Sequence, residues 1–277
     1  MDSKSSNETL GALGYYYHDF WMEEGDPRTK VFPFMNGGPW TVIGILLFYL
    51  YFVKSLGPNF MKDRKPFDLR RPIFWYNVFL VIFNGYFFLT GIYYTKFGWT
   101  TLYCTPPDPT KFDALWKYKL FVGWLFFFSK FIDLMDTVFF VLRKKFNQVS
   151  TLHVVHHAMM PITCWFGFKY VPSETAAFTP LINSFVHVVM YSYYALSTMG
   201  PKVKPYLWWK QYLTQLQIIQ LVMVLIHTTY IVLTPQCEIP KIFFLIGLPQ
   251  VLLILGMFCS FFMKTYTKQE KLESKSQ

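Results

Sequence analysis

The stretch His153-Val154-Val155-His156-His157-Ala158-Met159-Met160-Pro161 places three of the chain's six histidines close together inside an apolar segment. Residues three and four apart on a helix lie on the same face, so a helix here gathers all three imidazole rings. Neutral imidazole can act as a nucleophile, a proton acceptor or a metal ligand. Polar clusters are costly within a bilayer, so this stretch is a candidate functional site. The alternative is a hydrogen-bonded cluster that only packs helices together.

The composition around this stretch is that of a membrane protein. The chain has 277 residues, of which 53% are hydrophobic, 21% aromatic and only 15% charged; a soluble domain carries about 25% charged residues. We therefore predict an all-α membrane protein with seven transmembrane helices across 37–263, an N-terminal segment 1–36 and a tail 264–277. The expected spans are 37–56, 72–94, 115–142, 149–171, 175–199, 206–233 and 242–263.

The charge pattern predicts how these spans are oriented. The net charge is +10, and most of the 26 lysines and arginines fall in loops that share one side if the N-terminus is lumenal. This bias predicts a lumenal N-terminus and a cytosolic C-terminus, and it explains the basic charge without nucleic acid. The sequon Asn7-Glu8-Thr9 agrees, and Asn7 is a candidate glycosylation site.

The cysteines add a prediction to this topology. Cys104 and Cys237 both fall in lumenal loops, where disulfides can form. We predict a bridge between them, and two free thiols are the alternative. Cys164 and Cys259 lie within spans as small packing residues. The sequence has no CxxC pattern, which argues against zinc and thioredoxin-like chemistry.

Further polar residues mark the neighbouring spans. Lys130, Asp133, Asp136 and Thr137 follow one helical face, and a charge at the middle of a bilayer costs ~2.5–3.5 kcal/mol, so these groups should face inward and pair. They either take part in chemistry or only set helix register and orient a histidine.

Two later spans continue this pattern. Asn183 and His187 share a face of the fifth span; Lys210, Thr214 and Gln217 share a face of the sixth. Lys210 either binds phosphate or snorkels to the headgroups. We expect spans three to six to turn their polar faces toward a shared cavity. The remaining polar aromatic residues of these two spans receive no catalytic role: Tyr191, Tyr193 and Tyr194 are expected as interfacial anchors, and His227 stands apart.

Two kinds of chemistry fit the histidines. A metal site is one, because membrane di-iron desaturases and hydroxylases also use an HxxHH string, but they need several such boxes. Neighbouring His156 and His157 also diverge by about 100° on a helix, which makes chelation by all three rings awkward. The other is metal-free acyl transfer, in which imidazole attacks a thioester. Cys164 is a rival nucleophile, but it lies ~10.5 Å along the helix from His157.

Four strings together carry a family resemblance: 130–137, 153–157, 183–194 and 214–217. In this order they resemble the very-long-chain fatty acid elongases of the endoplasmic reticulum, over nearly the whole chain. The resemblance implies a 3-ketoacyl-CoA synthase that condenses a long-chain acyl-CoA with malonyl-CoA, releasing CO2 and CoA. It also implies a seven-helix fold in which six helices surround an acyl tunnel closed at the lumenal end.

The resemblance assigns roles by motif. His156 would be the acyl-accepting nucleophile, with His187 facing it from the fifth span. The rest of the catalytic site would comprise His153, His157, Asp133, Asp136, Asn183 and Gln217. Substrate contacts would come from Lys130, Tyr193, Lys210, Thr214, Lys264 and Thr267. The Cys104–Cys237 bridge also matches a pairing of such proteins.

The same resemblance sets the expected surroundings. It implies the endoplasmic reticulum membrane, no resident cofactor, and malonyl-CoA and long-chain acyl-CoA as substrates. Expected partners are the lipid bilayer, the reductases and dehydratase of the elongation cycle, and further copies of the chain in a homo-oligomer. Two other hypotheses stay open: a metal-dependent membrane desaturase or hydroxylase, and a non-catalytic acyl-CoA carrier.

Overall fold

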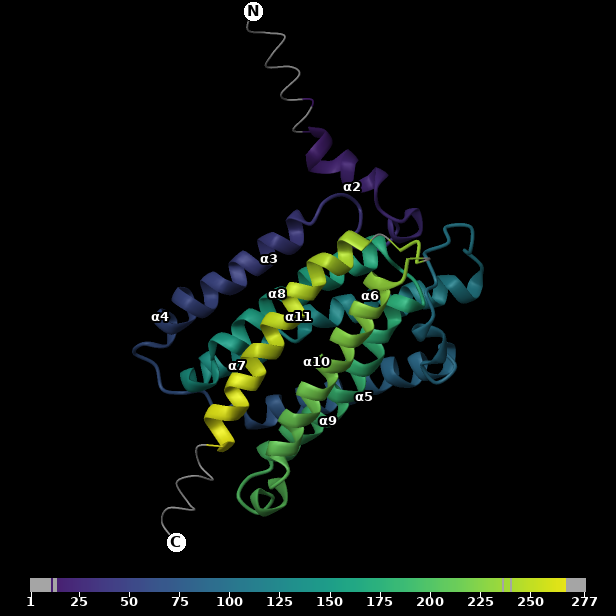
Figure 1. Ribbon diagram of the computed structural model, residues 1–277. Coiled ribbons are helices and arrows are strands. Elements are labelled where there is room, and N and C mark those ends of the chain that lie inside the picture. Colours follow the sequence, from purple (N-terminus) through teal and green to yellow (C-terminus); the bar gives the residue numbers. More distant parts are fainter. Residues whose placement is uncertain (1–10, 12–13, 236, 240, 268–277) are drawn as a thin grey trace, which may run out of the picture.

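The computed structural model describes residues 11, 14–235, 237–239 and 241–267, without the side chains of 241–246 and 267. The glycosylation prediction at Asn7 lies outside the described residues. Within them the chain is helical, without strands (Figure 1). The α-helices are α2 (Phe20–Glu23), α3 (Trp40–Tyr51), α4 (Gly57–Met61), α5 (Arg70–Tyr94), α6 (Ala114–Ile132), α7 (Met135–Leu142), α8 (Thr151–Tyr170), α9 (Phe178–Thr198), α10 (Lys210–Leu233) and α11 (Lys241–Phe262). Short 3-10 and π turns complete the list: η1 (Tyr15–Asp19), η2 (Pro27–Thr29), η3 (Phe52–Leu56), η4 (Trp99–Leu102), η5 (Phe146–Gln148), η6 (Thr175–Ala177), η7 (Lys204–Leu207) and η8 (Met263–Thr267).

Helix length and hydropathy make this a multi-pass membrane protein. In the described part of the chain, four helical segments are long and apolar enough to cross a bilayer: Trp40–Met61, Arg70–Tyr94, Lys204–Leu233 and Gly247–Tyr266. The other expected spans, 115–142, 149–171 and 175–199, also form helices, but these helices carry the charged, histidine and amide side chains. Such side chains lower their hydropathy, so seven spans remain a prediction.

Contacts between neighbouring helices link them in a closed order. Helix α9 packs between α5 and α10, α10 packs on α11, α11 on α8, and α8 on α6. The order closes with contacts between α6 and α5: the Tyr86 and Tyr118 hydroxyls lie 2.9 Å apart, and the Phe87 and Phe126 rings pack together. Helix α3 packs against α8, and α4 against α7. The sequence of contacts brings the histidine helix α8 into a closed set of helices, with α3 as an additional neighbour.

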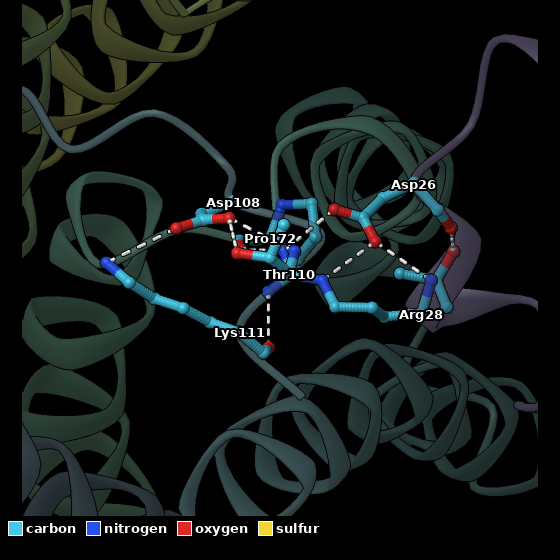
Figure 2. Close-up of polar contacts among 7 residues, drawn as sticks. Asp26, Arg28, Asp108, Thr110, Lys111 and Pro172 are labelled. Atoms are coloured by element: carbon cyan, nitrogen blue, oxygen red, sulfur yellow. Dashed lines mark hydrogen bonds and ion pairs between the residues drawn. The ribbon is translucent and has the colours of Figure 1, made fainter. Parts of the chain in front are cut away.

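A cap of loops holds one end of this arrangement, and Figure 2 shows its ion pair. Buried Arg28 forms a two-pronged pair with buried Asp26, at 2.9 Å from Nε to Oδ1 and 2.7 Å from Nη2 to Oδ2. The same guanidinium donates to the carbonyl oxygens of Lys111 at 3.0 Å and Pro172 at 3.4 Å. Arg28 thereby joins the N-terminal segment to the loops before α6 and after α8.

Two further links secure the cap. Cys104 and Cys237 form a disulfide with their Cα atoms 5.5 Å apart, which joins the loop before α6 to the loop before α11. Lys119 of α6 pairs with Glu174. Burial alone would raise the pKa of Glu174, but the hydrogen bond and charge of Lys119, together with Thr100 and the charge of Lys111, outweigh burial and lower this pKa.

Candidate active site

The three clustered histidines lie at the start of α8. The Ser150 hydroxyl caps this helix by accepting a hydrogen bond from the His153 amide at 3.2 Å, and the cap fixes where the helix begins. The His153 and His157 rings are in contact, with centroids 4.1 Å apart and planes tilted by 40°. His156 meets His157 edge-on at 5.6 Å. The helix therefore gathers the three rings as the spacing predicted.

His153 is held by hydroxyl groups from two other helices. Its Nε2 lies 2.8 Å from Oγ1 of Thr137 on α7. The same Oγ1 lies 2.8 Å from the hydroxyl of Tyr49 on α3. Thr137 and Tyr49 are both buried, so this polar path is shielded from solvent.

A charged network lies where α6 ends and α7 begins. Lys130 donates to Asp133 Oδ2 and to Asn183 Oδ1 of α9, both at 3.2 Å, and all three residues are buried. The Tyr191 hydroxyl lies 3.1 Å from Asp133 Oδ1 and 3.0 Å from Asp136 Oδ2. The network thus pairs the inward charges that the sequence predicted and links α6, α7 and α9.

Helix α9 supplies a polar stripe with one residue more than expected. Asn183, His187 and Tyr191 are four residues apart, so they share one face. Tyr191 is completely buried and donates to carboxylates, so its prediction as an interfacial anchor is wrong. The continued spacing of four residues after His187 was the available signal.

The two histidines expected to face each other each have an unused ring nitrogen. Among the described residues, Nδ1 of His156 and Nδ1 of His187 are buried without a hydrogen-bond partner. His187 lies one helical turn from Asn183, which accepts a hydrogen bond from buried Lys130. The site therefore presents two ring nitrogens without partners, and Lys130 reaches the face of α9 that carries His187.

The other predicted site residues are distributed along the bundle. Gln217 donates to Met190 Sδ at 3.4 Å, and buried Thr214 lies 3.5 Å from the Tyr266 hydroxyl. Tyr193 packs edge-on against Trp209, while Lys210 and Lys264 are exposed. These groups lie toward the C-terminal end of α9, the start of α10 and the end of α11. No hydrogen bond or ring contact among the described residues joins them to the clustered histidines, and the side chain of Thr267 is outside the described residues.

The remaining histidine and cysteine of interest have structural surroundings. His227 Nε2 bonds the Thr101 carbonyl at 2.9 Å, and the ring stacks on Phe178. Cys164 is a free thiol packed against the apolar core between α3, α6 and α8. Neither belongs to the histidine cluster.

The histidine cluster is neither a metal-binding group nor part of the open hollow between α5 and α9 in the described residues. In the described part of the chain, no group of three or more His, Cys, Asp or Glu side chains is placed to hold a metal ion. An open hollow of about 310 Å³ lies between the start of α5 and the end of α9, lined by Arg70, Arg71, Phe74, Trp75, Thr198 and Met199. It is separate from the histidines.

Comparison with known proteins decides the family. The model of the "ELO: GNS1/SUR4 family" matches residues 34–274. The chain belongs to this family. It is 42% identical over 269 residues to very long chain fatty acid elongase 1 of Mus musculus, covering 95% of this chain and 94% of that protein. It is 42% identical to elongase 1 of Homo sapiens, covering 91% and 90%, and 40% identical to elongase 7 of Drosophila melanogaster, covering 92% and 78%.

The ELO match encloses the whole candidate site of this family member. The histidines of α8, the α6–α7 network, and the polar residues of α9 and α10 all fall within residues 34–274. Tyr49 and Thr137 also fall within it.

Proposed function

We propose that this ELO-family member is the condensing enzyme of very-long-chain fatty acid elongation, a 3-ketoacyl-CoA synthase. It joins a long-chain acyl-CoA to malonyl-CoA and forms a 3-ketoacyl-CoA that is two carbons longer. The observation that carries the proposal is the pair of buried, unpartnered Nδ1 atoms of His156 and His187 in a chain of this family.

The first half of the proposed reaction is acyl transfer to His156. An imidazole nitrogen attacks the thioester carbonyl carbon, the carbon–sulfur bond breaks, and CoA leaves as a thiol after taking the proton from the ring. Negative charge develops on the carbonyl oxygen, and the buried ammonium of Lys130 supplies positive potential nearby. We assign to His187 the transfer of protons to and from this ring.

The second half consumes malonyl-CoA. Its terminal carboxylate leaves as CO2, and the electron pair of the broken carbon–carbon bond attacks the acyl carbon on His156. The carbon–nitrogen bond then breaks, and the departing ring nitrogen takes up a proton that enters from solution by way of His187, which restores the neutral imidazole. A closed hydrocarbon tunnel within the helices would stabilise the alkyl chain by ~0.8 kcal/mol for each buried CH2.

The proposal includes the orientation and location expected from the charge pattern and the family. The cap around Arg28 lies in the lumen of the endoplasmic reticulum, and the C-terminal end of α11 lies on the cytosolic side. CoA enters there, past Tyr193, Thr214, Lys210 and Lys264. The exposed lysines suit the phosphates of CoA because an ammonium pairs with them as a point charge.

Intact mass after incubation with a long-chain acyl-CoA alone tests the histidine route. We expect wild type to gain one acyl group on His156 and His156→Ala to lose both this adduct and CO2 release from malonyl-CoA. His18→Ala serves as the matched control, because His18 is exposed and outside the site. An acyl adduct on Cys164 would instead identify this thiol as the nucleophile. Acyl-CoA binding without CoA release from wild type would favour the carrier, and stoichiometric iron in active protein would favour the desaturase.

A further inference from the structure

The hydrogen-bonded path from Tyr49 through Thr137 to His153 gives one of the clustered histidines a different task. We propose that Tyr49 and Thr137 are positioning residues that fix His153 as the Nδ1–H tautomer, so that His153 orients the neighbouring rings and does not accept the acyl group. This inference rests on the proposed acyl transfer to His156. It names two residues, on α3 and α7, that act on the reaction only through a third.

The direction of the hydrogen bonds follows from the number of protons. In the described part of the chain the Tyr49 hydroxyl has one hydrogen-bond partner, Oγ1 of Thr137 at 2.8 Å. A buried phenol must donate its proton, so it donates to Thr137. The Thr137 hydroxyl then has its own proton free for Nε2 of His153, also at 2.8 Å. A neutral imidazole that accepts at Nε2 carries its proton at Nδ1.

This arrangement separates the roles of the histidines. The Nε2 lone pair of His153 is occupied by Thr137, whereas Nδ1 of His156 and Nδ1 of His187 have no partner. Of His153, His156 and His187, His153 is therefore the least available as a nucleophile. Its ring instead contacts His157, with centroids 4.1 Å apart and planes tilted by 40°, and His157 meets His156 at an interplanar angle of 84°.

The ring contacts explain how a hydroxyl on α3 influences the reaction. Rotation of His153 would change its ring contact with His157, and the His157 ring in turn contacts His156. The Phe140 ring also contacts the His153 ring, with centroids 5.2 Å apart. His153 therefore has an apolar neighbour in Phe140, and its hydrogen bond with Thr137 fixes the orientation of the ring. Displacement of a reacting group by about 1 Å can reduce a rate by on the order of a hundredfold.

The test uses variants that remove one hydroxyl and little volume. We expect Thr137→Val to lower kcat by roughly ten- to a hundredfold, with the KM values of acyl-CoA and malonyl-CoA unchanged. Thr137→Ser, which keeps the hydroxyl, should retain kcat within about twofold, and Tyr49→Phe should fall between the two. Tyr118→Phe is the control, because it also breaks a hydroxyl pair between helices, remote from the histidines.

A second measurement reads the tautomer itself. In protein labelled with 15N-histidine, one ring should show an unprotonated, hydrogen-bonded Nε2 in wild type and Thr137→Ser, and this signal should change in Thr137→Val. Equal losses in Thr137→Ser and Thr137→Val would overturn the proposal, because side-chain shape and not the hydroxyl would then matter. Wild-type kcat in Thr137→Val would overturn it too. If wild-type protein itself shows no condensation, the proposed function fails first.

Discussion

Tyr191 faces two carboxyl groups with a single hydroxyl. It lies about equally far from Asp133 Oδ1 and Asp136 Oδ2, and it is fully buried. Asp133 also holds Lys130, which reaches Asn183 on α9. The position of the buried ammonium near the histidines therefore depends in part on a phenol that the sequence suggested was a membrane anchor.

Tyr191→Phe tests this dependence at nearly constant volume. We expect a loss of about 1–3 kcal/mol in stability, because buried carboxylate oxygens lose their donor, together with reduced condensation. Apparent melting temperature and turnover measure the two effects. Tyr212→Phe is the control, since this ring is 59% exposed. If Tyr191→Phe behaves like the control, the phenol does not support the network.

The residues of the site differ in how far sequence could predict them. The three histidines, the Lys130–Asp133 pair and the Asn183–His187 face follow from helical spacing, which the chain obeys locally. Tyr191 continues the spacing and was open to the same argument. The role of Tyr49 could not be predicted from spacing, because Tyr49 lies in a uniformly apolar helix and its hydrogen-bond partner Thr137 is 88 residues away. Only the packing of α3 beside α7 and α8 reveals it.

Arg28 acts at the scale of the elements that it joins. Its guanidinium makes four hydrogen bonds, two to the Asp26 carboxylate and one each to carbonyl oxygens of two loops, so one side chain connects three segments. The sequence placed Arg28 in an undifferentiated polar segment, 1–36. Its burial is a tertiary effect, because the loops before α6 and after α8 cover it.

Arg28→Ala should therefore destabilise the cap strongly. Removal of one partner of a buried pair costs about 3–5 kcal/mol, and the Asp26 carboxylate would be left buried and unpaired. Arg28→Lys should recover only part of this loss, since an ammonium lacks the planar fork. Apparent melting temperature, compared with Arg70→Lys at an exposed position, measures the effect. Equal melting temperatures for wild type and Arg28→Ala would contradict it.

Helix boundaries show where element-scale prediction succeeds and where it stops. The expected segments 72–94, 149–171 and 175–199 lie within a few residues of α5, α8 and α9. The expected span 115–142 is interrupted at Asp133–Leu134, between α6 and α7. Hydropathy is averaged over a whole span, so it does not detect such a break. The side-chain bonds of Lys130, Tyr191 and Asn183 occur around it, and these depend on other helices.

The disulfide operates on the whole molecule. Cys104 and Cys237 are 133 residues apart in sequence, and the bridge encloses α6 to α10. In the chain-entropy description, closing a loop of this order stabilises the folded state by about 5 kcal/mol. This stabilisation is an upper limit for a membrane protein, because helices that remain inserted in the bilayer after unfolding are already confined.

Reduction of the bridge should lower the apparent melting temperature while activity at low temperature persists, since no cysteine of the bridge touches the histidines. Thermal inactivation with and without a thiol reductant measures this. Cys104→Ser/Cys237→Ser should match the reduced wild type and show no further response, whereas Cys259→Ser should behave as wild type. An unchanged melting temperature on reduction would show that the bridge adds no stability.

The contact between Tyr49 and Thr137 also sets an order of events in biogenesis. Tyr49 precedes Thr137 by 88 residues, so at ribosomal rates of about 5–20 residues per second the phenol is made about 4–18 seconds before its partner. The earliest long helix must therefore wait in the translocation machinery or the lipid while α5, α6 and α7 emerge. Assembly of the histidine cluster is consequently a late, non-local event in synthesis, and factors that retain nascent helices near one another would control its yield.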